Sequence, residues 1–201
     1  AYASGRTISV DMGDLDGTGN STVTISDGTT DKIKNIQNII GGAGADTIIG
    51  NSQNNSLVGG AGNDIIKGVA GDNQLLGGAG NDTIYSGTGN DSIDGGEDND
   101  TVSFEVATGD ITVSLTTTTA QAVGGGMGTD TITNIENVIG SNYNDTISGN
   151  SGINTLIGGA GNDKFVATKG SDTYYGGILA GTTHTVANGE SNSVDYSNAS
   201  K

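Results

Sequence analysis

Short glycine-rich segments recur every nine residues along much of this chain. A first run of seven nonapeptides extends from Gly41 to Ser103, and a second run of four extends from Gly140 to Tyr175. The eighth position of every unit is apolar or aromatic, and glycine recurs at the first, second and fourth positions. A fixed period of this kind indicates a solenoid, in which each repeat is one structural unit that stacks on its neighbours.

Each nonapeptide predicts a turn followed by a very short strand. Glycine adopts positive φ at little cost, which suits the polar turn, and one inward apolar side chain suits a three-residue strand. Two nonapeptides then make one coil of 18 residues, with a strand in each of two parallel sheets whose strands lie about 4.8 Å apart. We therefore expect an all-β chain that forms a right-handed parallel β-roll. The expected core ladder is Ile48, Leu57, Ile66, Leu75, Ile84, Ile93, Val102, Ile147, Leu156, Phe165 and Tyr174.

A longer repeat indicates two tandem roll units. Residues 29–46 match residues 128–145 at an offset of 99. We expect a first unit at residues 1–103, made of leader strands and the repeats 41–103. The second unit, residues 104–201, is expected to contain leader strands, the repeats 140–175 and an inserted loop at residues 178–190, before Asn192 resumes the sixth position of a turn.

The acidic residues decide between a disordered chain and a metal-binding one. Seven basic and 23 acidic side chains give a net charge of −16, which makes nucleic acid and anionic membranes poor partners. High net charge and 37 glycines would also suit disorder. However, stacking at 18 residues places the sixth positions Asp46, Asp64, Asp82 and Asp100 in one column. Bare carboxylates about 5 Å apart would repel each other, so this column predicts bound cations.

Calcium is the cation that suits these turns best. Ca²⁺ takes six to eight oxygen ligands and accepts backbone carbonyls, whereas Mg²⁺ demands a tighter octahedron. Zn²⁺ prefers His and Cys, and the chain has one His and no Cys. The strong carboxylate pairs predict about four ions, and weaker pairs raise the number to about six or seven. The candidate ligands are the carboxylates of Asp46, Asp64, Asp82, Asp91, Asp100, Asp145, Asp163 and Asp172, and the carbonyls of Gly42, Gly44, Gly60, Gly62, Gly78, Gly80, Gly159 and Gly161.

The other columns carry fewer carboxylates. Asn55 and Asn73 precede Asp91 on the opposite side of the first run. Asn offers an oxygen but no charge, so these turns are expected to close by hydrogen bonds, with a partial site between Asn73 and Asp91 left open. In the second run Asp145 and Asp163 form a good pair, and Asn154 with Asp172 forms a poorer one.

The units GGAGNDIIK, GGAGNDTIY and GGAGNDKFV resemble the repeats-in-toxin nonapeptide, glycine-glycine-x-glycine-x-aspartate-x-apolar-x. The resemblance implies Ca²⁺ held between stacked turns, and secretion by a one-step route to the bacterial cell surface or the medium. We therefore expect a non-enzymatic structural and interaction module of a large adhesin, surface-layer protein or toxin, which folds cooperatively on Ca²⁺ outside the cell. Its expected partners are calcium ions, neighbouring modules of the same polypeptide and, in self-association, further copies.

Three other functions remain as alternatives. The chain could be a self-assembling surface-layer or filament module, or a calcium roll appended to a secreted enzyme, although the tandem units argue against the latter. An ice-binding roll would show a regular outward threonine row, which the third positions do not provide.

Residues 11–20 suggest an acidic turn or an extra calcium site, and His184 is expected in an exposed loop. No apolar stretch reaches the ~18 residues of a membrane span.

Overall fold

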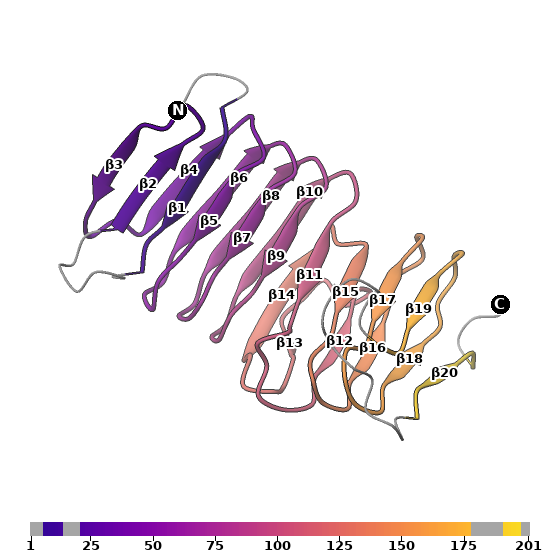
Figure 1. Ribbon diagram of the computed structural model, residues 1–201. Helices are drawn as coiled ribbons and strands as arrows, with labels where there is room; N and C mark the ends of the chain where they lie inside the picture. Colours follow the sequence, from indigo (N-terminus) through magenta and orange to yellow (C-terminus); the bar gives the residue numbers. More distant parts are fainter. Residues whose placement is uncertain (1–5, 14–20, 178–190, 198–201) are drawn as a thin grey trace.

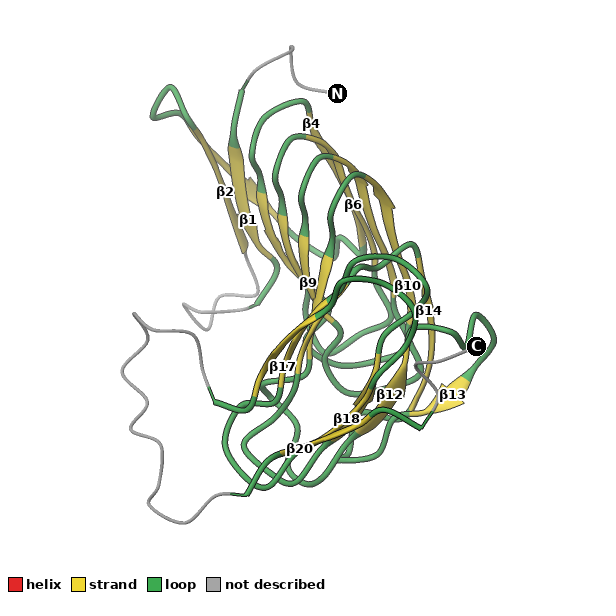
Figure 2. Cartoon of the chain, turned by 90° about the vertical axis from the view of Figure 1, so that its right-hand side faces the viewer, coloured by secondary structure: helices red, strands yellow, loops and turns green. Residues whose placement is uncertain are grey.

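The computed structural model describes residues 6–13, 21–177 and 191–197, and every element in them is a β-strand. The strands stack side by side along one axis, and the chain winds around that axis as a roll (Figures 1 and 2). No helix in these ranges has the length and apolar character to cross a membrane. The prediction of an all-β parallel β-roll is confirmed.

Three sheets make up the roll. The ten-stranded sheet contains β1 (Ile8–Asp11), β2 (Ser21–Ile25), β3 (Thr30–Ile33), β5 (Thr47–Ile49), β7 (Ile65–Lys67), β9 (Thr83–Tyr85), β11 (Thr101–Ser103), β15 (Asn137–Ile139), β17 (Thr155–Ile157) and β19 (Thr173–Tyr175). The six-stranded sheet contains β4 (Asn38–Gly42), β6 (Ser56–Ala61), β8 (Gln74–Ala79), β10 (Ser92–Glu97), β13 (Gln121–Ala122) and β14 (Thr129–Thr133). The four-stranded sheet contains β12 (Thr112–Ser114), β16 (Thr146–Ser148), β18 (Lys164–Val166) and β20 (Ser193–Asp195).

Strands two repeats apart pair in parallel and in register. Ile48 of β5 pairs with Ile66 of β7, which pairs in turn with Ile84 of β9. These three side chains have no exposed surface, because they point into the space between the sheets. The 18-residue coil is therefore confirmed, and the core is a ladder one aliphatic side chain wide on each sheet. Tyr174 is the ladder position that is only partly buried.

The first strands of the chain close one end of the ladder. β1 pairs in parallel with β5, β2 pairs antiparallel with β1, and β3 pairs antiparallel with β2 (Figure 1). The side chains of Ile8 and Val10 are buried there against the core. This hairpin thus covers the ladder next to β5.

The partner of the ten-stranded sheet changes along the chain. From β5 to β11 the chain alternates between the ten- and six-stranded sheets, and from β15 to β20 between the ten- and four-stranded sheets. Strand β11 pairs with β15, so the ten-stranded sheet runs across the expected boundary between residues 103 and 104. The division into units 1–103 and 104–201 stays a prediction.

Candidate metal centre

Four aspartates lie above one another beside the ten-stranded sheet and form what we call the first column. Its members are Asp46, Asp64, Asp82 and Asp100, and each side chain is at most 1% exposed. The main-chain N–H of Asp64 donates to Oδ1 of Asp82 at 2.8 Å, and that of Asp82 donates to Oδ1 of Asp100 at 2.8 Å. Asp46 donates in the same way to Asp64 at 2.7 Å. One carboxylate oxygen per residue thus links consecutive coils.

The second carboxylate oxygen of each residue in the first column is unsatisfied. Oδ2 of Asp46, Asp64, Asp82 and Asp100 is buried and has no hydrogen-bond partner. Burial, together with the charge of neighbouring carboxylates, raises the pKa of Asp64 to about 6 and that of Asp100 to about 7. Burial also raises the pKa of Asp46 and of Asp82. The column therefore needs either protons or a cation to be stable as folded.

The glycines of the turns leave room for these oxygens. A Cβ on Gly59 would collide with Oδ2 of Asp64, and one on Gly77 would collide with Oδ2 of Asp82. First-position glycines were absent from the expected ligand set, yet they lie against the unsatisfied oxygens. The sequence could have indicated this role, because every repeat that contains a first-column aspartate begins with glycine.

The glycines that were expected as ligands line the space between coils. The carbonyl oxygen of Gly42 lies against Gly60, and that of Gly60 lies against Gly78. The fourth positions repeat this arrangement, with the carbonyl of Gly44 against Gly62 and that of Gly62 against Gly80. In the second run, Gly159 and Gly161 lie against the carbonyls of the preceding coil. A Cβ would fill each of these narrow gaps.

The second column, which we define as Asn55, Asn73 and Asp91 on the opposite side of the roll, closes its asparagine turns by hydrogen bonds. The Asn73 amide Nδ2 donates to the carbonyl of Gly71 at 2.9 Å and to Oδ1 of Asp91 at 3.0 Å. The main-chain N–H of Asn55 donates to Oδ1 of Asn73 at 2.9 Å. The expectation that these turns close by hydrogen bonds agrees with this geometry.

The second column continues into a residue that the sequence analysis missed. Asp91 donates its main-chain N–H to Oδ1 of Asp130 at 2.9 Å, and Asp130 has no exposed surface. Burial raises the pKa of Asp130 to about 7 and that of Asp91 to about 6. The sequence did contain a signal, because residues 125–133 read GGMGTDTIT and match the nonapeptide motif at each of its glycine, aspartate and apolar positions. They are out of phase with the run that ends at Ser103, so counting in nines passes over them.

Asp145 and Asp163 form a third column, and this expected pair is capped at one end. Asp145 donates its main-chain N–H to Oδ1 of Asp163 at 3.0 Å, as the stacking predicts, and Asp163 donates to Asn192 at 2.7 Å. However, Ser141 donates its main-chain N–H to Oδ2 of Asp145 at 2.5 Å and its hydroxyl to Oδ1 at 2.7 Å. Asp145 therefore has less need of a cation than the first column has.

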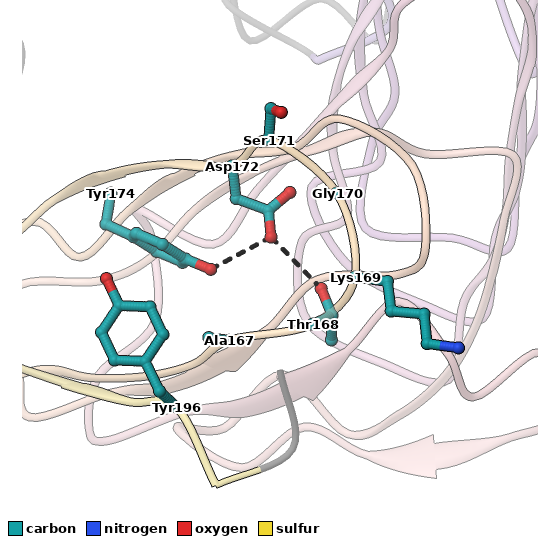
Figure 3. A pocket seen from close by; sticks show the side chains of 8 residues that line it. All are labelled: Ala167, Thr168, Lys169, Gly170, Ser171, Asp172, Tyr174 and Tyr196. Atoms are coloured by element: carbon teal, nitrogen blue, oxygen red, sulfur yellow. Dashed lines mark hydrogen bonds between the residues drawn. The ribbon is translucent and has the colours of Figure 1, made fainter. Parts of the chain in front are cut away.

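Asp172 is capped by side chains of its own turn (Figure 3). Tyr174 donates its hydroxyl to Oδ2 of Asp172 at 3.1 Å, and Thr168 does so at 3.4 Å. Asn154 donates its main-chain N–H to the other carboxylate oxygen at 3.1 Å. The pocket around Asp172 has a volume of about 440 Å³ and includes Tyr196. Both oxygens of Asp172 are thus occupied by hydrogen bonds.

Three expectations from the sequence lie outside the described residues. They concern His184, residues 14–20 of the expected acidic turn and the loop 178–190.

The donor set fits calcium. Two ion pairs of the described residues, Arg6–Asp27 and Lys164–Asp195, lie at the surface and leave the first column without a basic partner. No three His, Cys, Asp or Glu side chains of the described residues gather around one point, so carboxylates alone would not complete a metal shell. Ca²⁺ accepts a coordination shell that backbone carbonyls complete. The atoms between these turns that could act as ligands are all oxygens. The carboxylate and carbonyl oxygens of the first-column turns therefore suit Ca²⁺.

Comparisons with known proteins agree with this chemistry. A search of curated proteins finds no match to the chain. A family model of the RTX calcium-binding nonapeptide repeat matches residues 37–66, 67–102 and 137–178, which together cover more than half of the chain. Repeats of that family are calcium-binding structural modules rather than catalytic ones. This chain belongs to the family of RTX calcium-binding nonapeptide repeats.

Proposed function

We propose that this chain is a calcium-dependent structural and interaction module of a large secreted or cell-surface bacterial protein. The observation that carries the proposal is the first column, whose four buried aspartates each have one oxygen without a partner. Membership in a repeat family that occurs in secreted bacterial proteins supports the location. The carboxylates of the first column and the glycine carbonyls between its turns would hold the ions, which supply the compensating positive charge.

The same column explains why folding should depend on calcium. The core contributes one inward aliphatic side chain per nine residues, whereas the glycine-rich backbone loses much conformational entropy on folding. A net charge of −16 opposes compaction further. Since the sites exist only in the folded roll, the free energy of calcium binding becomes free energy of folding. The module would stay unfolded where calcium is scarce, and would fold and stiffen outside the cell.

Circular dichroism tests this proposal directly. The chain is expected to lack a β-sheet spectrum in excess chelator and to gain it cooperatively on addition of Ca²⁺. A titration with Mg²⁺ is the control, because its small octahedral shell suits these turns poorly. A full β-sheet spectrum in chelator, with a melting temperature that calcium does not change, would contradict the proposal.

Self-association is a second candidate, favoured by the sheet edges. Strand β4 is the last strand of the six-stranded sheet at one end of the roll, and β19 and β20 end the other two sheets (Figure 1). The side chain of Ile40 on β4 is 69% exposed. Edges that pair with no further strand among the described residues are templates for pairing with another chain. Sedimentation velocity with Ca²⁺ should then show oligomers that Ile40→Lys reduces, and a monomer at all concentrations would contradict end-to-end assembly.

A further inference from the structure

The two parts of the roll meet at a junction that follows β11. After β11 the chain leaves the regular coils, forms β12 in the four-stranded sheet, and then returns to the six-stranded sheet with β14. Strand β14 pairs in parallel with β10, where Ile132 lies in register with Ile93. The next strand, β15, continues the ten-stranded sheet beside β11. The placement of β14 on β10 therefore determines how the later coils stack on the earlier ones.

The turn before β14 has the geometry of a nonapeptide turn. Gly128 has a φ of 96° and lies directly against the carbonyl of Gly89, which has a φ of 132°. The main-chain N–H of Thr129 donates to Oδ1 of Asn90 at 2.9 Å. This hydrogen bond repeats, across 39 residues, the bonds that join consecutive turns of the regular coils across 18. The turn is thus a full member of the second column.

Two buried carboxylates meet where these turns stack. Asp91 and Asp130 are 2% and 0% exposed, and each has a buried Oδ2 without a hydrogen-bond partner. Their Oδ1 atoms are occupied, since Oδ1 of Asp130 accepts the N–H of Asp91 and Oδ1 of Asp91 accepts the N–H of Asn73 at 2.8 Å. The arrangement repeats that of neighbouring members of the first column. Two buried carboxylate oxygens without a partner at this depth are stable only when they are protonated or neutralised by a cation.

We propose that Asp91 and Asp130, with carbonyls of their turns, form a calcium site that fixes β14 on β10. This junction site rests on the proposed function, and Asp130 lies outside the residues that the family model matches. An ion there would join chain segments on either side of residues 104–124. Binding at this one site therefore couples the stacking of the later coils to calcium, separately from the first column.

The test compares Asp130→Asn with the unmodified chain in saturating Ca²⁺. Asn keeps an Oδ1 that accepts the N–H of Asp91 but removes the charge. Calorimetry with Ca²⁺ is expected to show one ion fewer. Hydrogen exchange is expected to become at least tenfold faster in residues 104–133, while β7 and β9, which follow first-column turns, keep their protection.

Asp72→Asn is the matched control. Asp72 lies in the adjacent turn, is exposed, and its Oδ1 accepts the N–H of Asn90 at 2.8 Å. Asn63 makes the equivalent bond to Asn81 at 3.0 Å, so an amide serves this position equally well. This control loses the same charge but should bind as many ions as the unmodified chain. Asp91→Asn should lose the same ion as Asp130→Asn, and the double variant should lose no additional ion at this junction.

The outcomes separate the junction site from the proposed function. If the unmodified chain binds no Ca²⁺, the proposed function fails. If it binds Ca²⁺ but Asp130→Asn binds just as many ions, the junction site alone is overturned. A variant that does not fold leaves anomalous scattering from calcium-grown crystals of the unmodified chain to decide. A peak within about 2.6 Å of both Oδ2 atoms supports the site. Peaks in the first column without one here overturn it.

Discussion

The side-chain amide of Asn73 donates a hydrogen bond to the carbonyl oxygen of Gly71 at 2.9 Å, and so closes its own turn. In the first column the corresponding side chains are carboxylates, which cannot donate. Oδ2 of Asp64 and Oδ2 of Asp82 accordingly lack any partner. The residue at the sixth position thus decides whether a turn closes by a hydrogen bond or requires a cation.

Asn73→Asp should convert one kind of turn into the other. The variant loses the donor to Gly71 and places a second buried carboxylate beside Asp91. In chelator with enough trimethylamine N-oxide to populate the fold, it should be less stable by about 1–3 kcal/mol, the cost of an unsatisfied buried polar group. With Ca²⁺ it should bind one additional ion in calorimetry. Asn54→Asp is the control, because this exposed side chain only accepts the N–H of Asp72 at 2.9 Å. Equal stability of both variants in chelator would contradict the prediction.

Asp82→Asn should affect calcium binding more than Asp46→Asn does. Asp82 has an aspartate of the first column in the coils on both sides, whereas Asp46 is bounded on one side by the main-chain N–H of Ile8 at 2.7 Å. The interior substitution therefore removes charge from two intervals, and the terminal one from a single interval. Calcium titrations followed by circular dichroism measure the two midpoints, and identical midpoints would count against shared carboxylates.

The same substitution should have the opposite effect without calcium. In Asp82→Asn the new amide can donate to a carbonyl of its turn, as Asn73 does, and one buried charge disappears. In chelator with enough trimethylamine N-oxide to populate the fold, this variant should therefore melt at a higher temperature than the unmodified chain. A lower melting temperature in chelator would show that Oδ2 of Asp82 already has a favourable environment.

The stability of the calcium-free roll should fall as the pH rises. Burial raises the pKa of Asp64 from 3.8 to about 6 and the pKa of Asp100 from 3.8 to about 7. Stability that depends on the protonated form is complete below pH 3.8 and is lost as the pH passes through the folded values. In chelator with enough trimethylamine N-oxide to populate the fold, the roll should melt higher at about pH 5 than at pH 8. With limiting Ca²⁺ the order should reverse, because protons compete with the cation.

A double variant, Asp64→Asn with Asp100→Asn, provides the control for this pH dependence. It should show a smaller difference between the two pH values in chelator than the unmodified chain does. The exposed substitution Asp72→Asn should leave the difference unchanged. If the double variant retains the full difference in melting temperature, other groups are responsible for it.

Val69→Gly should stabilise the roll. Val69 has a φ of 72°, a region that β-branched residues avoid, while Gly60 and Gly78 occupy the same second position in neighbouring repeats. Relief of about 1–3 kcal/mol of strain exceeds the entropy that glycine adds to the unfolded chain, about 0.4–1 kcal/mol. Calorimetric melting in Ca²⁺ should rise by about 2–4 °C. Val58→Gly within β6 is the control and should lower the melting temperature, and a decrease for both would contradict the strain argument.

The sequence by itself determined the coil. Inward side chains at every ninth residue require one strand per nonapeptide, and burial of a single side chain per strand leaves only one workable register. The pairing of Ile48 with Ile66 and the hydrogen bonds from Asp46 to Asp64 follow from that local spacing. Carboxylates spaced by 18 residues were therefore predictable as a column.

Only the tertiary structure decided where the columns end and which carboxylates remain unsatisfied. Ser141 caps Asp145 and Tyr174 caps Asp172, contacts that depend on side-chain reach rather than on the period. Asp130 joins Asp91 because the chain after Ser103 makes an excursion of irregular length. The return of that excursion to β10 buries apolar side chains that follow no repeat, namely Phe104, Ile111 and Val123. A period specifies how neighbouring coils stack, but the place where an interrupted chain rejoins them is set by the packing of the interruption itself.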